Sequence, residues 1–169
     1  MKKKVVKKQN ITNICFICGI ANEAGLHTEF YELEDGTIAA TAVAKDFHRS
    51  YPGRVHGGVS TALLDETIGR AIMITEPDTW GVTVEINTKY KKPVPYDVPL
   101  LITGRITKNS RLLFLGEGSI ILPDGNVAVT ASGKYMKMEL SKIADFETSG
   151  EIWEPYLKDE DPEEFDIPD

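Results

Sequence analysis

One long apolar segment between two strand-rich regions constrains the fold of this chain most. Residues 58–75 contain no proline and place Leu64, Ile68, Ala71 and Ile72 at helical spacing, with further apolar residues widening that surface. A helix that is apolar over most of its circumference is expected to be enclosed by other elements. The segment therefore predicts one buried helix.

The regions on either side of this helix have the pattern of β-strands. Turn sequences lie at Asp35-Gly36 and at residues 123–126. Strands are expected over residues 26–31, 37–44, 81–90, 100–107, 112–122 and 127–138. Two strands, one helix and four strands cannot form a doubly wound sheet, in which helices and strands alternate. The order predicts an α+β hot dog fold, an antiparallel sheet wrapped around one long central helix.

Charge is distributed unevenly along the 169 residues, whose net charge is −7. Residues 1–14 form a basic N-terminal lead, and residues 143–169 form an acidic tail in which Lys158 is the one basic residue. We expect both ends to be solvated and mobile around a folded domain at residues 15–142. A pI of about 5.0 argues against a nucleic-acid partner. No apolar run is long enough for a membrane span.

The N-terminal region lacks the pattern of a secretion signal, because polar residues interrupt the apolar run and no small-residue cleavage site follows. A cytoplasmic, reducing location is therefore expected, with Cys15 and Cys18 as packed thiols. The alternative is half of a zinc site, with His27 or His48 as further ligands. Structural zinc sites normally have four well-spaced ligands. We expect no metal and no cofactor.

The sequence His56-Gly57-Gly58 lies at the predicted start of the buried helix. Glycines leave backbone N–H groups unobstructed, and the helix dipole attracts a negatively charged oxygen to this point. Such a site can stabilise the oxyanion that a thioester carbonyl becomes during hydrolysis. The alternative is that the glycines only permit a tight turn. His56 is expected to orient the loop or cap backbone groups in preference to acting as a base.

Asp65 is a carboxylate within the apolar helix, where a charge without partners is unfavourable. At about 100° per residue, Gly58, Thr61, Asp65 and Gly69 share one stripe of the helix. The small residues of this stripe allow another surface to approach Asp65 closely. Glu66 lies about a quarter turn away. The alternative is a solvated helix face on which both acids are exposed.

Gly58 and Asp65 lie too far apart on one helix to act on the same bond. Seven residues separate them, which corresponds to about 10 Å along the axis. An attacking group must come within about 3 Å of the carbonyl. The simplest arrangement is a two-fold homodimer in which the Gly57 and Gly58 amides of one chain face Asp65 of the other.

The segment at residues 56–66 resembles the HGG-x6-D/E helix motif of PaaI-like acyl-CoA thioesterases in the thioesterase superfamily. The cysteine-containing segment at residues 15–26 and the predicted strand at residues 81–90 are also similar to that family. Together the resemblance covers residues 15 to about 138. It implies hydrolysis of an acyl-CoA thioester by a homodimer, often paired into a tetramer.

The resemblance also implies roles for individual residues. Asp65 would be the general base or the nucleophile, and the Gly57 and Gly58 amides would polarise the carbonyl. In relatives, a hydroxyl at the position of Thr83 can help to hold the attacking water, and Thr83 keeps this hydroxyl. Some relatives carry an asparagine six residues before the motif histidine, where this chain has Ser50. The catalytic candidates are His56, Gly57, Gly58, Asp65 and Thr83.

The candidate substrate-binding residues are Ser50, Thr61, Glu66, Lys89 and Lys91. The two lysines belong to a basic set at predicted strand ends and turns, whose side chains are suited to the phosphates of coenzyme A but are equally typical of solvated charges. The set is Lys89, Lys91, Lys92, Arg105, Lys108 and Arg111. Two other functions stay open: a non-catalytic acyl-CoA sensor, and a hot dog hydratase or dehydratase acting on an enoyl thioester.

Overall fold

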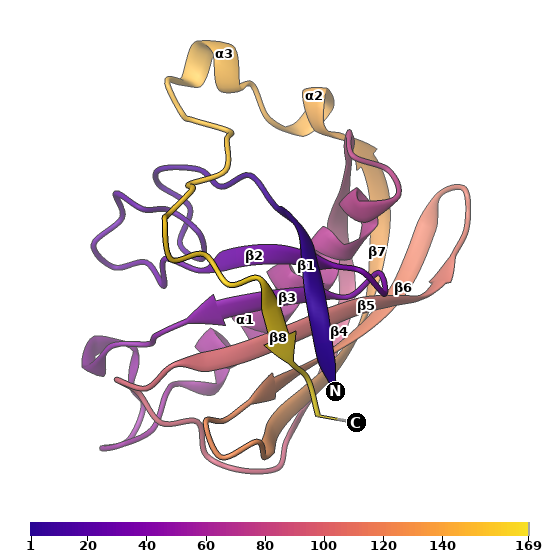
Figure 1. Cartoon of the computed structure of the whole chain (residues 1–169). Helices are drawn as coiled ribbons and strands as arrows, with labels where there is room; N and C mark the ends of the chain where they lie inside the picture. Colours follow the sequence, from indigo (N-terminus) through magenta and orange to yellow (C-terminus); the bar gives the residue numbers. More distant parts are fainter. Residues whose placement is uncertain (169) are drawn as a thin grey trace.

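The computed structural model describes residues 1–168, with the backbone alone at residue 147. An antiparallel sheet of eight strands curves around helix α1 (Gly57–Gly69), which continues as the 3-10 helix η2 (Arg70–Ile74) (Figure 1). The strand order is β4-β7-β6-β5-β3-β2-β1-β8. The predicted hot dog fold is therefore confirmed.

The six predicted strands are present, with ends that differ by a few residues from those expected. The strands are β1 (Lys2–Lys8), β2 (Glu29–Leu33), β3 (Ile38–Ala42), β4 (Thr79–Tyr90), β5 (Leu100–Asn109), β6 (Leu113–Ile121), β7 (Val127–Glu139) and β8 (Glu164–Asp166). The short helices are η1 (Asp46–His48), α2 (Leu140–Ile143) and α3 (Phe146–Ser149). Within residues 1–168, no helix combines the length and the apolar character needed to cross a membrane.

Helix α1 is enclosed because glycines in the facing strands allow close approach. A Cβ on Gly104 of β5 would lie 2.6 Å from the carbonyl oxygen of Thr67, and one on Gly118 of β6 would lie 2.9 Å from Cγ1 of Ile68. Ile68 and Leu64 are 0% exposed. The apolar periodicity of the helix thus corresponds to real burial, and larger side chains at the two glycines would push the helix away from the sheet.

The charged ends of the chain pair with each other, contrary to the expectation of solvated, mobile ends. The basic lead forms β1, which lies between β2 and the acidic β8. Lys8 Nζ is 2.6 Å from Glu29 Oε2 and 2.5 Å from Asp161 Oδ1, and Lys2 bonds to Glu164. Opposite charges and the free hydrogen-bonding edge of β2 explain why these polar segments add to the sheet.

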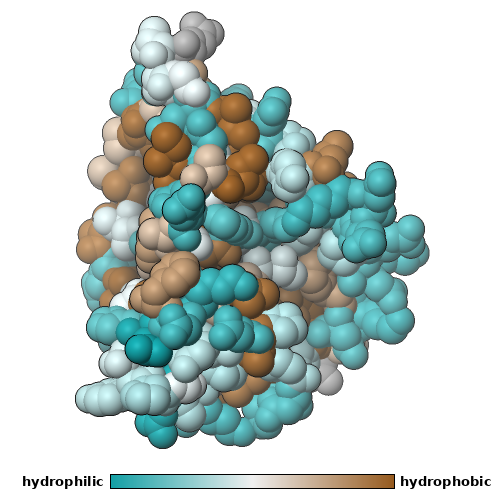
Figure 2. Space-filling view, turned by 90° about the vertical axis from the view of Figure 1, so that its left-hand side faces the viewer, coloured by the Kyte–Doolittle hydropathy of each residue, from teal (hydrophilic) through white to brown (hydrophobic). Residues whose placement is uncertain are grey.

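The middle of the acidic tail is held by Trp153, whose ring centroid lies 5.4 Å from that of Trp80 and 5.2 Å from that of Phe146. Other large apolar side chains stay exposed, including Phe47 and Tyr51 in the loop before α1. Figure 2, which views the molecule from the left of Figure 1, shows apolar patches separated by polar side chains on this face.

Candidate active site

The start of α1 is capped by His56. The Gly58 N–H donates a hydrogen bond of 2.9 Å to Nδ1 of His56, the N-cap residue. The capping role expected for this histidine is therefore seen in the structure. The Gly58 amide already has an acceptor within the chain, whereas the hydrogen bonds of residues 1–168 provide none for the Gly57 N–H. Gly57 is the amide that remains available to a ligand.

Hydroxyl groups from β4 hold this first turn in place. The Tyr90 hydroxyl donates to the Gly57 carbonyl oxygen at 2.7 Å and lies 2.7 Å from Thr61 Oγ1. Thr61 Oγ1 also donates to Thr88 Oγ1 at 3.3 Å. A Cβ on Gly57 would lie 3.2 Å from the Tyr90 hydroxyl. The helix start is thus fixed against the far end of β4 by Tyr90 and Thr88, which the sequence analysis did not identify. They contact Thr61, a predicted substrate-binding residue, which the structure uses in this packing.

Asp65 lies half-buried near the other end of α1, and two hydroxyl groups contact one of its oxygens. Thr83 Oγ1 of β4 donates to Asp65 Oδ1 at 2.8 Å. The Tyr135 hydroxyl of β7 lies 3.2 Å from the same Oδ1 and 3.2 Å from the Asp65 carbonyl oxygen. The carboxylate is therefore oriented by side chains from two neighbouring strands.

Tyr135 is a further residue of this site that sequence reasoning missed. Its side chain is 0% exposed and stacks on Phe114, with ring centroids 4.9 Å apart. Burial raises the pKa of the Tyr135 hydroxyl, and the nearby Asp65 carboxylate raises it further. The hydroxyl consequently keeps its proton at neutral pH and acts as a donor to Asp65. A tyrosine at an inward-facing position of a strand gives no signal of this role in the sequence.

Glu66 points away from Asp65 and is part of a buried ion pair. Its Oε1 accepts hydrogen bonds from Arg70 at 2.8 Å (Nη2) and 3.0 Å (Nε). Arg70 is 1% exposed. The predicted substrate-binding role of Glu66 has no support in this geometry, because the carboxylate is occupied by a cation inside the fold.

The other predicted substrate-binding residues lie away from Asp65. Ser50 is exposed in the loop before α1, where its N–H donates to the Arg54 carbonyl oxygen at 3.0 Å. Lys91 is exposed just after β4. Lys89 lines a groove of about 580 Å³ on the outer face of the sheet. Alternation along β4 sends Tyr90 toward α1 and Lys89 to the opposite face.

An oriented carboxylate and an available amide toward opposite ends of one enclosed helix make up the candidate site of this hot dog fold protein. Residues 52–129 match the model of the thioesterase superfamily, and that segment includes the helix motif, Asp65 and Thr83. The resemblance to this superfamily expected from the motif is therefore confirmed.

Sequence relatives show the same resemblance over part of the chain. The chain is 33% identical to mouse acyl-coenzyme A thioesterase 13 over 66 residues, which is 39% of this chain and 47% of the relative. It is 27% identical to the human protein over 78 residues, 46% of this chain and 56% of the relative. The matched segment thus spans about half the length of these relatives.

Solved structures show the same fold. A crystal structure of a thioesterase superfamily protein aligns with a TM-score of 0.67 at 29% identity, covering 73% of this chain and 63% of the other. A hypothetical thioesterase from Streptococcus pneumoniae, solved with coenzyme A, aligns with a TM-score of 0.60 at 22% identity, covering 66% and 89%. The first match is consistent with the superfamily, and the second shows the fold alone.

Proposed function

We propose that this protein hydrolyses acyl-CoA thioesters to a free acid and coenzyme A. The observation that carries the proposal is the Asp65 carboxylate, which the Thr83 hydroxyl contacts at 2.8 Å on a helix enclosed by the sheet. The sequence relatives are acyl-CoA thioesterases, and a protein with the same fold was solved with coenzyme A. A carboxylate held by hydroxyl donors on such a scaffold is suited to activating water or attacking a thioester directly.

The carbonyl oxygen of the thioester binds at the start of α1 in this mechanism. The Gly57 N–H donates to the developing oxyanion, and the positive end of the helix adds to its stabilisation. His56 acts through Gly58, whose N–H it accepts, and so positions the turn. Asp65 then removes a proton from the attacking water or forms an acyl anhydride, and in both routes the coenzyme A thiolate leaves.

Strand β4 provides the geometry for a site shared between two chains. It is an edge strand of the described sheet, and it contacts Asp65 through Thr83 and the start of α1 through Tyr90. If two β4 strands pair antiparallel about Ile86, the Thr83 end of each lies beside the Tyr90 end of the other. Exposed strand edges are templates for such pairing. A homodimer built this way brings Asp65 of one chain toward Gly57 of its partner.

A thiol-release screen over short, long and aromatic acyl-CoAs tests the proposed activity. Release of coenzyme A with saturation kinetics is the expected result for at least one acyl class. Saturable binding of acyl-CoA without thiol release would identify a sensor instead. Hydration of an enoyl thioester without thiol release would identify the hydratase alternative.

The shared site predicts that two inactive variants restore activity when their subunits are mixed. Asp65→Asn removes the carboxylate, and Gly57→Val places a side chain against the Tyr90 hydroxyl at the amide. In a heterodimer, one site then combines an intact Gly57 with an intact Asp65. Random mixing should recover about a quarter of the wild-type specific activity, because half of the dimers carry one intact site of two. Each variant alone is the control, and no recovery after confirmed subunit exchange would contradict a shared site.

Thr83→Val is expected to lower kcat/KM roughly tenfold, which corresponds to about 1.4 kcal/mol. The variant keeps the shape of the side chain but removes the hydroxyl that donates to Asp65 Oδ1. Steady-state kinetics of thiol release measures the effect. Thr83→Ser is the matched control because it keeps the hydroxyl, and it should stay close to the wild-type rate. Equal losses in both variants would show that the methyl group matters and the hydrogen bond does not.

A further inference from the structure

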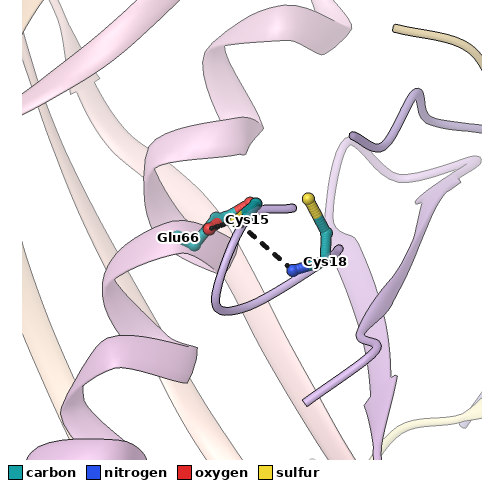
Figure 3. Close-up of side chains that lie close together, drawn as sticks. All are labelled: Cys15, Cys18 and Glu66. Atoms are coloured by element: carbon teal, nitrogen blue, oxygen red, sulfur yellow. Dashed lines mark hydrogen bonds between the residues drawn. The ribbon is translucent and has the colours of Figure 1, made fainter. Parts of the chain in front are cut away.

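Cys15 and Cys18 lie side by side against α1, in a turn that the proposed hydrolysis does not use. Figure 3 shows the two cysteines beside Glu66, and the two sulfurs and a Glu66 carboxylate oxygen all lie within 4.8 Å of one another. Both cysteines are free thiols. Their sulfurs are therefore close enough to react with each other after a rotation of the side chains.

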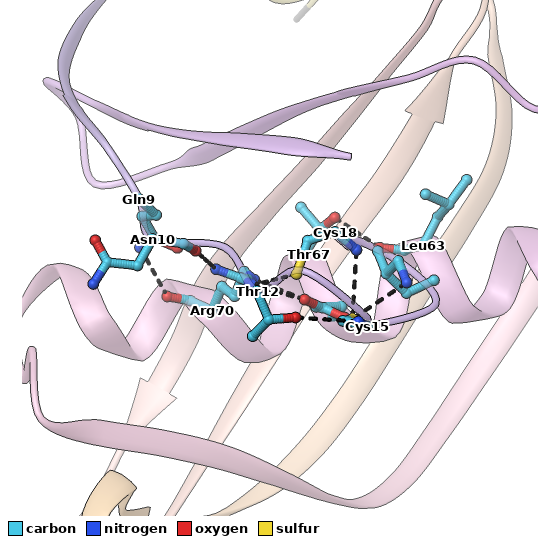
Figure 4. Close-up of polar contacts among 10 residues, drawn as sticks. Gln9, Asn10, Thr12, Cys15, Cys18, Leu63, Thr67 and Arg70 are labelled. Carbon is cyan, nitrogen blue, oxygen red and sulfur yellow. Dashed lines mark hydrogen bonds and ion pairs between the residues drawn. The ribbon is translucent and has the colours of Figure 1, made fainter. Parts of the chain in front are cut away.

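The backbone of this turn holds the Cys15 sulfur in a fixed place. The N–H groups of Ile17 and Cys18 donate to Cys15 Sγ at 3.3 and 3.4 Å. Figure 4 shows Cys15 and Cys18 in this turn beside α1. The Gly19 N–H donates to the Cys15 carbonyl oxygen at 2.8 Å, and a Cβ at Gly19 would lie 2.4 Å from that oxygen. The turn is therefore tight, and its amide donors favour negative charge on Cys15.

The two thiols differ in the way that an attacking and a resolving cysteine differ. The hydrogen bond with the Cys18 thiol lowers the pKa of Cys15 to about 7, against the opposing effects of burial and Glu66. The hydrogen bond with Cys15 and burial raise the pKa of Cys18, which is 1% exposed. Cys15 is half-buried and so can meet a small reagent from solvent. Thiolate character and access together mark Cys15 as the reactive sulfur.

Arg70 argues against a metal ion between these groups. Its Nη2 lies 3.3 Å from Cys18 Sγ and 2.8 Å from Glu66 Oε1. A guanidinium charge therefore already neutralises the carboxylate and contacts the second sulfur. Structural zinc sites also have four ligands, and this group offers three.

We propose that Cys15 and Cys18 are a redox-active dithiol that hydroperoxides oxidise to an intramolecular disulfide. The Cys15 thiolate attacks one peroxide oxygen, the O–O bond breaks, and the leaving hydroxide or alkoxide takes up a proton. The resulting Cys15 sulfenic acid is attacked by the Cys18 sulfur. An S–S bond forms, the S–O bond breaks, and the leaving hydroxide takes the Cys18 proton as water. The peroxide is the two-electron acceptor.

Oxidation of the native protein with hydrogen peroxide tests the proposal without using thioester hydrolysis. Intact-mass spectrometry should show the loss of two hydrogen atoms from the wild type, reversed by dithiothreitol. Cys18→Ser should stop at a sulfenic acid on Cys15, which dimedone traps. Cys15→Ser should keep its buried thiol. In the wild type, iodoacetamide should label Cys15 at least about tenfold faster than Cys18, with a midpoint near pH 7.

Three results would overturn the proposal. The first is a wild-type protein whose thiols survive peroxide while it stays folded by circular dichroism. The second is equal labelling of the two cysteines in the wild type, a measurement that does not depend on the folding of either variant. The third is stoichiometric zinc in the purified protein that protects both sulfurs until a chelator removes it.

Discussion

Asp65→Asn is expected to lower kcat/KM for acyl-CoA hydrolysis by about 10² to 10⁴, the usual contribution of a positioned acid or base. Asparagine keeps the size of the side chain and can still accept from Thr83, whose hydroxyl contacts Asp65 Oδ1 at 2.8 Å. It cannot remove a proton from water or form an anhydride. Thiol release under steady-state conditions measures the loss, and circular dichroism checks that the fold is kept.

Glu117→Gln is the matched control for this variant. It removes the same charge from β6 on the outer face of the sheet, where Glu117 pairs with Arg105. Its neighbours Gly116 and Gly118 face Ile68 of α1, so Glu117 points away from the helix. The control should retain wild-type turnover. Near wild-type turnover in Asp65→Asn as well would refute the catalytic role and with it the proposed mechanism.

Arg70→Met should reduce the free energy of unfolding by about 3–5 kcal/mol, because it leaves the Glu66 carboxylate without its cation in a mostly buried place. The guanidinium also donates to the Asn10 carbonyl oxygen at 2.7 Å and lies 4.0 Å from the centre of the Phe30 ring. Methionine retains much of the apolar stem but none of these polar contacts. Urea unfolding followed by circular dichroism measures the loss.

Arg105→Met provides the comparison, since Arg105 and Glu117 form an ion pair exposed to solvent. Its expected cost is below about 1 kcal/mol. Combining Arg70→Met with Glu66→Gln should recover part of the loss, because the buried carboxylate charge is then removed together with its partner. If Arg70→Met and Arg105→Met cost the same, the buried network does not stabilise the fold as argued.

The local pattern of the chain was sufficient to predict the helix and the strands that enclose it. Helical spacing of Leu64 and Ile68 and alternation in the strand-forming segments depend on neighbours within a few residues, and both residues are fully buried as expected. The motif from His56 to Asp65 is also local. Its groups lie seven to nine positions before Asp65, so the rise of one helix determines their separation. For that reason the fold and the separation of Asp65 from the start of α1 could be predicted.

The contacts between distant segments were decided by the tertiary structure alone. Tyr135 reaches Asp65 across 70 positions of the chain. The Glu66–Arg70 pair is local in its four-residue spacing, but the Cys15 turn and the Asn10 carbonyl oxygen, which contact this pair, come from the distant N-terminal segment. The charged ends, which the sequence predicted to be solvated and mobile, pair with each other as β1 and β8. Composition and periodicity describe which face of an element is polar, but they do not specify which polar group from elsewhere will meet it, because that depends on the register and curvature of the whole sheet.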